Sequence, residues 1–586
     1  MKGVFIICML TIVALTLPVA AEEINAQIVE SSELEITQSG TITISGATEQ
    51  MWINISIPQN FEGQKVKSID ANLPFEFSTD RYGNKFMTFS IKNPDKEIFY
   101  QITSVVEIKK YNCGMLSENV WLEPTPLVQS TDPVIKEMAE QITIGEKGEF
   151  SDISKLAAWI NENIRYKEEF YDVNLTSRQT LQKKEGVCDE MSNLLAAFAR
   201  SIGYPSAVLV GYAYGRLGNS SDFQPHSFVQ IGGSGCWDPT WAQGGFVDAL
   251  HIVFARLPDS RWNDITVYII GNENTSIEIS PMNVSIRLKK YSQNPVVSMK
   301  SEALEPIVSK GYAVIKTDIT TNGCVMTKLK SVSCGSQDSE FMAGINTEDV
   351  IGFCGNATFF SIFKVPDNLE KNAIYTCPIR TYAHAGTNTT TNIKLNANAA
   401  YEDATLKADK YTAMPGEKIT FVAQDQYIFT DYGAWAKDNL TIIAPAHDFR
   451  VWSYAKGGLV EAQVYIVKFK PIEVEIISND SVQLGETINI SMRITNKLQN
   501  PQAVSVRFGN RTETKTITTT DTFHFTFTPK DREDRLLKFI ISTGQYNTTE
   551  IKVIEVREEK QFFAEIMDII SGFFSAIVDY ITGLFK

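Results

Sequence analysis

Cys188, His226 and Asp238 are the residues whose types and spacing best support covalent chemistry. Cys188 follows Gly186-Val187 and opens a segment whose apolar residues recur at helical spacing. At the first position of a helix, backbone N–H groups and the helix dipole favour a thiolate, and the same amides can stabilise the oxyanion of a tetrahedral intermediate. The two acidic residues after Cys188 suit a helix start but oppose a low thiol pKa, so the chemistry requires a base.

His226 and Asp238 lie on two expected strands joined by the glycine-rich turn Gly232-Gly233-Ser234-Gly235. A hairpin brings directly opposed Cβ atoms to about 5 Å, and the shared parity of the two residues points both to one face. In such an arrangement Cys188 attacks an amide carbonyl, His226 takes and returns the proton, and Asp238 holds the imidazole in the required tautomer. The pattern therefore predicts cysteine-based acyl transfer.

Helices followed by strands are expected to position these residues. After Asp132 apolar residues recur at helical spacing, first at Ile135, Met138, Ala139 and Ile142, then at Ile153, Leu156, Ala157, Ile160 and Ile164, with the second helix ending near Tyr166. A third helix begins at Cys188 and stops at Gly203. Strands are expected at 207–214, 227–231 and 236–239, and helices followed by an antiparallel sheet predict an α+β core.

Short motifs around the three residues occur in the order found in the transglutaminase-like superfamily. They are Gly186-Val187-Cys188, the helix end Arg200-Ser201-Ile202-Gly203-Tyr204-Pro205, Gly211-Tyr212, the His226 strand and Trp237-Asp238-Pro239-Thr240, preceded by the 159–166 segment and Thr180-Leu181. The chain thus resembles this superfamily over about residues 130–260, under a quarter of its length. The resemblance implies a core similar to papain-type proteases, with Cys188 as nucleophile, His226 as base and Asp238 as the residue that orients it.

The sequence departs from the superfamily pattern in two places. Family members often carry His-Ala-Trp where this chain has His226-Ser227-Phe228, which keeps the base and an aromatic residue. Cys236 beside Trp237 is less usual and could place a second thiol near the site. Gln182 has the spacing from Cys188 of the oxyanion-hole glutamine in papain-like enzymes, but chance explains that spacing equally well and Gln182 is not counted as catalytic.

The chain start and the sequons indicate export. Residues 1–21 pass from a short positive head through an apolar stretch to Ala20-Ala21, as in a signal peptide. Asn-x-Ser/Thr sequons recur from Asn54 to Asn547, which in an exported protein indicates glycosylation. The protein is therefore expected to be extracellular.

The cysteine count favours one free thiol. Without Cys8, which lies in the leader, an odd number of cysteines remains. The four between Cys324 and Cys377 are expected to form two disulfides, because their spacing matches no zinc site. Cys113 and Cys236 could form a third disulfide, which would leave Cys188 free, although by count alone any cysteine could be the odd one.

The expected organisation is multi-domain, with the α+β transglutaminase-like core flanked by β-sandwich domains. Runs that alternate apolar and polar residues between Gly, Pro, Asn and Asp are the basis of the β assignments. The expected boundaries are a signal peptide at 1–21, an N-terminal β domain at 22–125, the transglutaminase-like domain at 126–290, a cysteine-rich β domain at 291–395, a β domain at 396–470, an immunoglobulin-like sandwich at 471–556 and an amphipathic helix at 557–586.

The expected terminal helix is apolar except for one narrow polar stripe. Such a helix can lie in a membrane interface, span a bilayer, or pack on the body of the protein or on another copy. Spanning would bury Asp568 and Asp579 at a cost of several kcal/mol each unless they face partner helices. The first two poses would tether the protein to its cell surface.

The net charge and the remaining motifs limit which classes of partner and cofactor the protein is expected to bind. A net charge of −15 argues against nucleic acid, because phosphate backbones require a surplus of Lys and Arg. The other histidines show no ligand spacing and there is no dense carboxylate loop, so no metal or other cofactor is expected; these histidines are His251, His384, His447 and His524. The oligomeric state is not indicated.

Two functions remain open. The resemblance implies a surface enzyme that acts on protein or peptide amides through a thioester on Cys188, with hydrolysis favoured over transfer to an amine because exported microbial members are mostly hydrolases. The alternative is a non-catalytic adhesin or cell-envelope component, because most of the chain has the pattern of β-sandwiches.

Overall fold

The computed structural model describes residues 24–143, 148–171, 173–217, 220–272, 274–336, 339–399, 401–414, 416–445, 447–467, 472–497, 501–543 and 546–557. The expected signal peptide at 1–21 lies outside these residues, and so does the terminal helix expected at 557–586 except for Arg557, which is the last residue of a strand. The described chain is multi-domain and strand-rich. Within it, no helix is both long and apolar enough to cross a membrane.

Four α-helices occur in the described residues: α1 (Pro133–Ile142), α2 (Glu149–Asn163), α3 (Ser177–Lys183) and α4 (Cys188–Ser201). Short 3₁₀ turns are η1 (Ala26–Ile28), η2 (Asn119–Leu122) and η3 (Glu168–Phe170). Asp132 caps α1 by accepting the backbone N–H groups of Val134 and Ile135, and Thr176 with Gln179 forms a capping box at α3. The helix expected from Cys188 is confirmed as α4, and its stripe of Met191, Leu194, Leu195 and Phe198 is buried.

The sheet beside these helices is antiparallel and has the order β13 (His251–Leu257), β9 (Ser206–Leu217), β10 (Ser220–Ile231), β11 (Gly235–Asp238), β12 (Gln243–Gly244). The three strands expected here are confirmed as β9, β10 and β11. Helix α4 packs on β9 and β10, and its buried stripe shares one core with Val208, Val210, Val229 and Ile231 of these strands. A short parallel pair, β7 (Arg165–Tyr166) and β8 (Glu185–Gly186), precedes α4.

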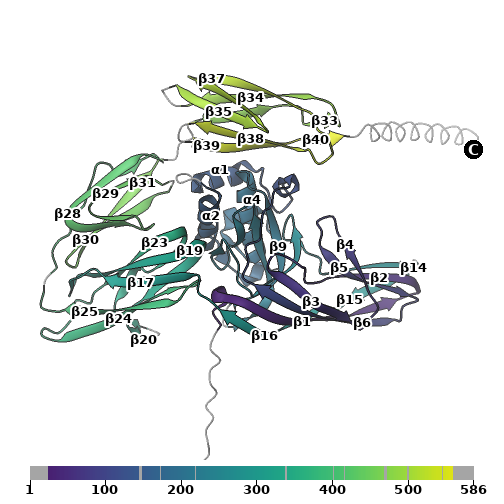
Figure 1. The fold of residues 1–586 in the computed structure, drawn as a ribbon, viewed down its shortest axis with the longest axis horizontal. Helices are drawn as coiled ribbons and strands as arrows, with labels where there is room; N and C mark the ends of the chain where they lie inside the picture. The colour runs from purple at the N-terminus through teal and green to yellow at the C-terminus, as the bar shows by residue number, and fades with distance from the viewer. Residues whose placement is uncertain are drawn as a thin grey trace, which may run out of the picture.

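Two sheets form the N-terminal unit. The first contains β15 (Ser276–Ile279), β1 (Val29–Ser45), β6 (Glu97–Lys109), β3 (Gln64–Ala71) and β16 (Asn283–Gln293), and the second has the order β14 (Ile265–Gly271), β2 (Thr48–Ser56), β5 (Lys85–Lys92), β4 (Glu76–Thr79). Strands β14, β15 and β16 follow the site sheet in sequence but return to pair with β2 and β1. The N-terminal unit therefore contains strands that precede the helices in the sequence and strands that follow them (Figure 1).

The site sheet continues into the next unit, because β12 pairs with β19 (Tyr312–Val332) at Gly244 and Met326. The other strands of this unit are β17 (Val297–Ala303), β18 (Ile307–Val308), β20 (Gly335–Ser336), β21 (Ser339–Glu340), β22 (Ala343–Asn346), β23 (Glu348–Lys364), β24 (Ile374–Ala383) and β25 (Asn388–Asn396).

A further unit contains β26 (Lys407–Ala408), β27 (Thr412–Ala413), β28 (Lys418–Thr430), β29 (Trp435–Ile443), β30 (Phe449–Ala455) and β31 (Gly458–Ile466). The last contains β32 (Ile472–Ile477), β33 (Ser481–Gln483), β34 (Ile488–Asn496), β35 (Gln502–Phe508), β36 (Arg511–Ile517), β37 (Thr520–Phe527), β38 (Leu536–Thr543), β39 (Tyr546–Val553) and β40 (Glu555–Arg557). Figure 1 shows this last unit lying against the helical layer. Thr548 donates to Glu140 of α1 over 2.6 Å, and Arg535 pairs with Glu123.

Three disulfides join the described cysteines: Cys113–Cys236, Cys324–Cys354 and Cys334–Cys377. The first is the pair considered from the sequence, and the other two lie within the cluster that was expected to form two disulfides. Cys188 is the free cysteine among the described residues. The disulfides indicate that the protein works in an oxidising environment.

Candidate active site

The first turn of α4 presents Cys188. Strand β8 leads directly into the helix, and the Oε2 atom of Glu190 accepts the backbone N–H of Val187 over 3.0 Å, while its Oε1 atom accepts the N–H of Leu175. A Cβ atom on Gly186 would lie 2.6 Å from Cβ of Glu190, so only glycine allows this approach. The Glu190 carboxylate therefore fixes the turn that carries the cysteine.

The Cys188 thiol is buried, with 5% of its surface exposed. Burial, and next the charge of Asp189, raise the pKa of the thiol well above its usual range, although the neighbouring groups of Ser227 act in the opposite direction. The sulfur lies 4.0 Å from Oδ1 of Asp189. Burial and the acidic neighbour therefore oppose ionisation of the thiol, so its activation depends on a base.

Tyr166 and Tyr171 lie close to the Cys188 thiol. Strand β7 pairs with β8 so that Tyr166 is opposite Gly186, and the hydroxyl groups of Tyr166 and Tyr171 are 3.0 Å apart. Burial and the nearby charge of Cys188 raise the pKa of Tyr166.

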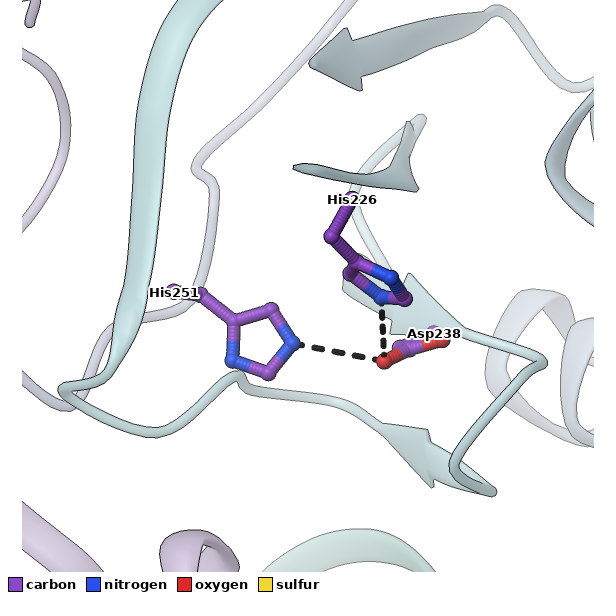
Figure 2. A group of neighbouring side chains, drawn as sticks. All are labelled: His226, Asp238 and His251. Atoms are coloured by element: carbon purple, nitrogen blue, oxygen red, sulfur yellow. Dashed lines mark hydrogen bonds and ion pairs between the residues drawn. The ribbon is translucent and has the colours of Figure 1, made fainter. Parts of the chain in front are cut away.

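The β10–β11 hairpin brings His226 and Asp238 together. Its register pairs Val229 with Trp237 and Ile231 with Gly235, so His226 and Asp238 lie diagonally on one face. The Nε2 atom of His226 is 3.0 Å from Oδ2 of Asp238, and both side chains are buried (Figure 2). The structure therefore joins the two residues that the sequence pattern had paired.

Cys188 lies beside this pair without bonding to it. The Oγ atom of Ser192 on α4 donates to the carbonyl oxygen of Ser227, the residue next to His226, over 3.0 Å. The charge of Asp238 is also close enough to raise the Cys188 pKa. Within the described residues, Cys188 and His226 form no hydrogen bond. Because Nε2 of His226 is held by Asp238, Nδ1 is the atom left to meet the thiol.

Asp238 is fully buried and anchored on both oxygens. Its Oδ1 atom accepts the backbone N–H groups of Thr240 and Trp241 over 2.9 and 3.3 Å. Its Oδ2 atom faces Nε2 of His226 and also Nε2 of His251, at 3.3 Å. Burial alone would raise the pKa of Asp238, but the charge and hydrogen bond of His226 and the contact with His251 outweigh it and hold the pKa well below its usual range.

His251 continues the site beyond Asp238. Its Nδ1 atom lies 3.2 Å from Oδ1 of Asp248, a buried carboxylate whose Oδ1 atom also accepts the N–H of Leu250. Burial would lower the pKa of His251, but Asp248 and Asp238 raise it to about 9. His251 is at the first position of β13, so this second imidazole comes from a strand on the far side of the sheet order from β11.

Aromatic rings enclose the imidazoles. The indole of Trp241 stacks on His226, with ring centroids 4.1 Å apart and planes at 10°. Trp241 also meets the edge of His251, as does Phe228. These contacts restrict the rotation of both imidazoles and exclude water, which strengthens the electrostatic interactions with Asp238.

His226, Asp238 and His251 are also the described group best placed to hold a metal, because their ligand atoms lie within 4.8 Å of one another. The two imidazole contacts to Asp238 account for this grouping without an ion.

A cavity of about 990 Å³ adjoins Trp241 on the outside of the site. It is bounded by residues 24–28, by Asp248 and Trp241, and by Lys328, Lys330 and His384 of the following unit. Cys188, His226 and Asp238 do not line it, whereas Trp241, which stacks on His226, does.

Sequence reasoning missed Trp241, Asp248 and the place of His251 in the site. The sequence gives His251 no ligand spacing and no place among the site motifs, and in the structure it is buried against Asp238. The sequence holds a signal for Trp241, because it follows Asp238 closely. It holds none for His251, because the register of β13 is set by its pairing with β9. Gln182 is exposed on α3, and Cys236 is in a disulfide, which excludes it as a second thiol.

Comparison with known proteins identifies one family. Residues 136–249 match the transglutaminase-like superfamily, and this match includes all three expected site residues. No curated relative matches the sequence.

Similarities to solved structures are distant. A candidate cysteine protease from Cytophaga hutchinsonii is 17% identical, with a TM-score of 0.36 over 45% of this chain and 93% of that chain. A mutant α2-macroglobulin from Salmonella is 9% identical, with a TM-score of 0.17 over 60% of this chain and 28% of that chain. A bacterial ice-binding adhesin is 12% identical, with a TM-score of 0.15 over 46% of this chain and all of that chain. The family match, rather than these similarities, identifies the domain.

Proposed function

This chain carries a domain of the transglutaminase-like superfamily, and we propose that the domain is a cysteine acyl-transfer enzyme with Cys188 as nucleophile, His226 as general base and Asp238 as the residue that orients the imidazole. The observation that carries the proposal is the 3.0 Å contact between Nε2 of His226 and Oδ2 of Asp238 beside a free cysteine at a helix N-terminus. The substrate is a protein or peptide amide.

The proposed acylation step uses Nδ1 of His226 and the sulfur of Cys188. Nδ1 of His226 takes the thiol proton, and the Cys188 sulfur attacks the amide carbonyl to give a tetrahedral oxyanion. Backbone N–H groups of the first α4 turn are oriented to stabilise that oxyanion. His226 then returns the proton to the leaving amine, the C–N bond breaks and a thioester remains on Cys188.

Deacylation reverses the roles. His226 removes a proton from water, or from an amine, which attacks the thioester carbonyl, and the thiolate leaves and is reprotonated. Water gives hydrolysis and a lysine amine gives a cross-link; we favour hydrolysis. The fixed Asp238 carboxylate stabilises the imidazolium in both steps.

The location of the enzyme is also a proposal. Three disulfides support an extracellular site of action, and the sequons add glycosylation. We propose that the segment at 558–586 tethers the protein to the cell surface by membrane contact.

Thiol labelling tests the proposed site directly. Purified protein is reacted with iodoacetamide across a range of pH, and labelling of Cys188 is followed by mass spectrometry, with Cys188→Ala as the blank. We expect His226→Ala to slow labelling by at least about 10-fold, in line with the contribution of a general base. His524→Ala is the matched control, because His524 lies on β37 in the last unit and contacts Ser491 there. Equal rates in the His226→Ala variant and the wild type would refute the base.

Product analysis then separates the two reactions. A peptide library is incubated with and without added primary amines, and products are read by mass spectrometry as cleaved or deamidated acids or as amine adducts. Acids in the presence of excess amine support hydrolysis, whereas adducts would assign the enzyme to cross-linking.

A non-catalytic binding role is the second candidate, favoured by the burial and raised pKa of the Cys188 thiol. One variant distinguishes the binding role from the catalytic role. A Cys188→Ala protein that keeps full biological activity would support binding, and one that loses it while remaining folded would support catalysis.

A further inference from the structure

We infer that His251 is a positioning residue of the site, held as an imidazolium between Asp238 and Asp248, and that its charge tunes the Cys188–His226 pair. The inference rests on the proposed function for its consequence, but its first part concerns only the state of one imidazole. His251 belongs to β13 and none of the sequence motifs of the site includes it.

The positions of the two carboxylates around the ring favour the charge. Each nitrogen of His251 faces a carboxylate oxygen, Nε2 at 3.3 Å from Asp238 and Nδ1 at 3.2 Å from Asp248. A neutral imidazole carries one N–H, so one of these nitrogens would point a lone pair at a carboxylate. The Nδ1 contact is an ion pair by distance and not an aligned hydrogen bond, since Nδ1 has no hydrogen-bond partner among the described residues. A lone pair 3.2 Å from the Asp248 carboxylate would still be repelled, so the doubly protonated ring fits the two contacts best.

Both carboxylates also accept hydrogen bonds from groups other than His251. Asp238 accepts two backbone N–H groups on Oδ1, and Asp248 accepts the N–H of Leu250 on Oδ1 and the side-chain amide of Gln243 on Oδ2. Protonation of either carboxyl would cost part of these bonds, and the contacts of Asp238 hold its pKa well below its usual range. His251 is fully buried, and a buried cation between two such anions is compensated rather than exposed to the apolar core.

The surroundings of His251 contain few other charges. Asp238 of β11, Asp248 before β13, and His226 of β10 are the titratable groups beside its ring, while the hydroxyl of Tyr111 donates to its backbone carbonyl. Phe228 and Trp241 cover its edges. Burial and the charge of Asp248 raise the Tyr111 pKa well above its usual range, so Tyr111 stays neutral. The His251 pKa, raised to about 9, agrees with the geometry.

This charge acts on the catalytic pair through Asp238. With His251 neutralised, Asp238 would present a fuller negative charge to His226 and Cys188. Both the thiolate and neutral imidazole would then be disfavoured, because a nearby negative charge raises the pKa of acids and of imidazoles alike. Both limbs of a pH–rate profile would move to higher pH.

Two measurements test the inference on the full chain. Histidine is labelled with ¹⁵N, the His251 resonances are assigned by comparison with His251→Gln, and they are titrated by NMR. We expect the doubly protonated ring at pH 7. A neutral His251 at pH 7 would overturn the inference whatever the activity of the protein.

The second measurement is the pH profile of Cys188 labelling. His251→Gln keeps an N–H donor for Asp238 but removes the charge, so we expect both limbs to shift upward by about 1 pH unit. A merely structural role would lower the rate without moving the limbs. Asp248→Asn is the second variant if His251→Gln does not fold; it weakens the hold on the imidazolium and should give a smaller shift in the same direction. His524→Gln, remote from the site, should leave the profile unchanged.

The outcomes separate the inference from the proposed function. The pH profile of Cys188 labelling could change in His226→Ala but in neither His251→Gln nor Asp248→Asn. That result would support the proposed enzyme and refute the role of His251. A different result would be a doubly protonated His251 together with a Cys188 labelling rate that does not change in His226→Ala. It would confirm the buried imidazolium and refute the catalytic pair.

Discussion

At the scale of single residues, Asp238 has to remain charged while it is fully buried. An isolated carboxylate in this position would be neutralised, because desolvation costs several kcal/mol. Two imidazole nitrogens and two backbone N–H groups surround it instead. The same contacts that orient His226 therefore also link the stability of the domain to the protonation of its histidines.

The first prediction at this scale concerns stability against pH. His251 has a pKa of about 9 in the folded chain and 6.5 as the ordinary value, so folding binds its proton more tightly. Its contribution is fully present below pH 6.5 and is lost as the pH rises to about 9, with an upper size of about 3 kcal/mol. The local opening free energy of β10 and β11, from hydrogen exchange corrected for intrinsic rates, should fall across this window.

The control for this prediction must remove the thiol. Burial raises the Cys188 pKa, so ionisation of that thiol also destabilises the fold at high pH. The comparison is therefore made in Cys188→Ser, with and without His251→Gln. A fall of the same size in both proteins would contradict the assignment to His251.

The residues that sequence could identify are those set by local rules. Cys188 is at a helix start, and the parity of His226 and Asp238 across a glycine turn places them on one face, which the hairpin register agrees with. Trp241 and His251 follow no such rule. The stacking of Trp241 depends on the path after Asp238, and His251 reaches Asp238 only because β13 pairs with β9.

At the scale of elements, the junction from β8 into α4 is the part of the fold that aims the nucleophile. Glu190 reaches back from the first turn to the backbone of Val187 and across to Leu175, and Gly186 leaves room for that side chain. The helix stripe was predictable from its period. The end of α2 was not: the expected helix continues to about Tyr166, whereas α2 ends at Asn163 because Arg165 and Tyr166 pair with β8.

The second prediction tests this junction. Gly186→Ala would place a methyl group 2.6 Å from Cβ of Glu190, so the turn must shift and release one of the Glu190 bonds. We expect a loss of about 1–3 kcal/mol in local stability and a slower labelling of Cys188. Gly323→Ala is the matched control, because a Cβ there meets nothing within 4 Å and its backbone is not left-handed. Equal effects of the two substitutions would show that the junction does not depend on Gly186.

At the scale of the whole molecule, the site sheet is tied to its neighbours by pairings that no local pattern reveals. Strands β14, β15 and β16 return to the N-terminal sheets, and β12 continues into β19. Alternation along the chain predicts that these segments are strands, but not which partner each one takes, because partner choice depends on contacts between distant residues. The cysteines could be assigned in part, because four of them cluster between Cys324 and Cys377, but the pairing within that cluster was left open.

The Cys113–Cys236 disulfide holds β11, and with it Asp238, to the segment after β6. Gln230 of β10 donates to the carbonyl of Cys113 over 2.7 Å, so the segment also contacts the strand that carries His226. Its closed loop spans 123 residues, against 30 for Cys324–Cys354. On chain entropy alone the first disulfide contributes about 5 kcal/mol and the second about 3.5 kcal/mol, a modest difference.

The effect on the site should differ much more than the effect on stability. We expect the double substitution Cys113→Ala with Cys236→Ala to increase hydrogen exchange in β11 and to lower the His226-dependent labelling rate of Cys188 by about 10-fold, because the Asp238 carboxylate loses its fixed position. The double substitution Cys324→Ala with Cys354→Ala removes a disulfide between β19 and β23, outside the hairpin, and should leave that rate within about 2-fold. Both proteins are compared at a temperature where circular dichroism shows each to be folded. Equal losses would mean that the disulfides act on the site only through overall stability, whereas a loss confined to the first variant would show that the N-terminal unit positions the catalytic carboxylate.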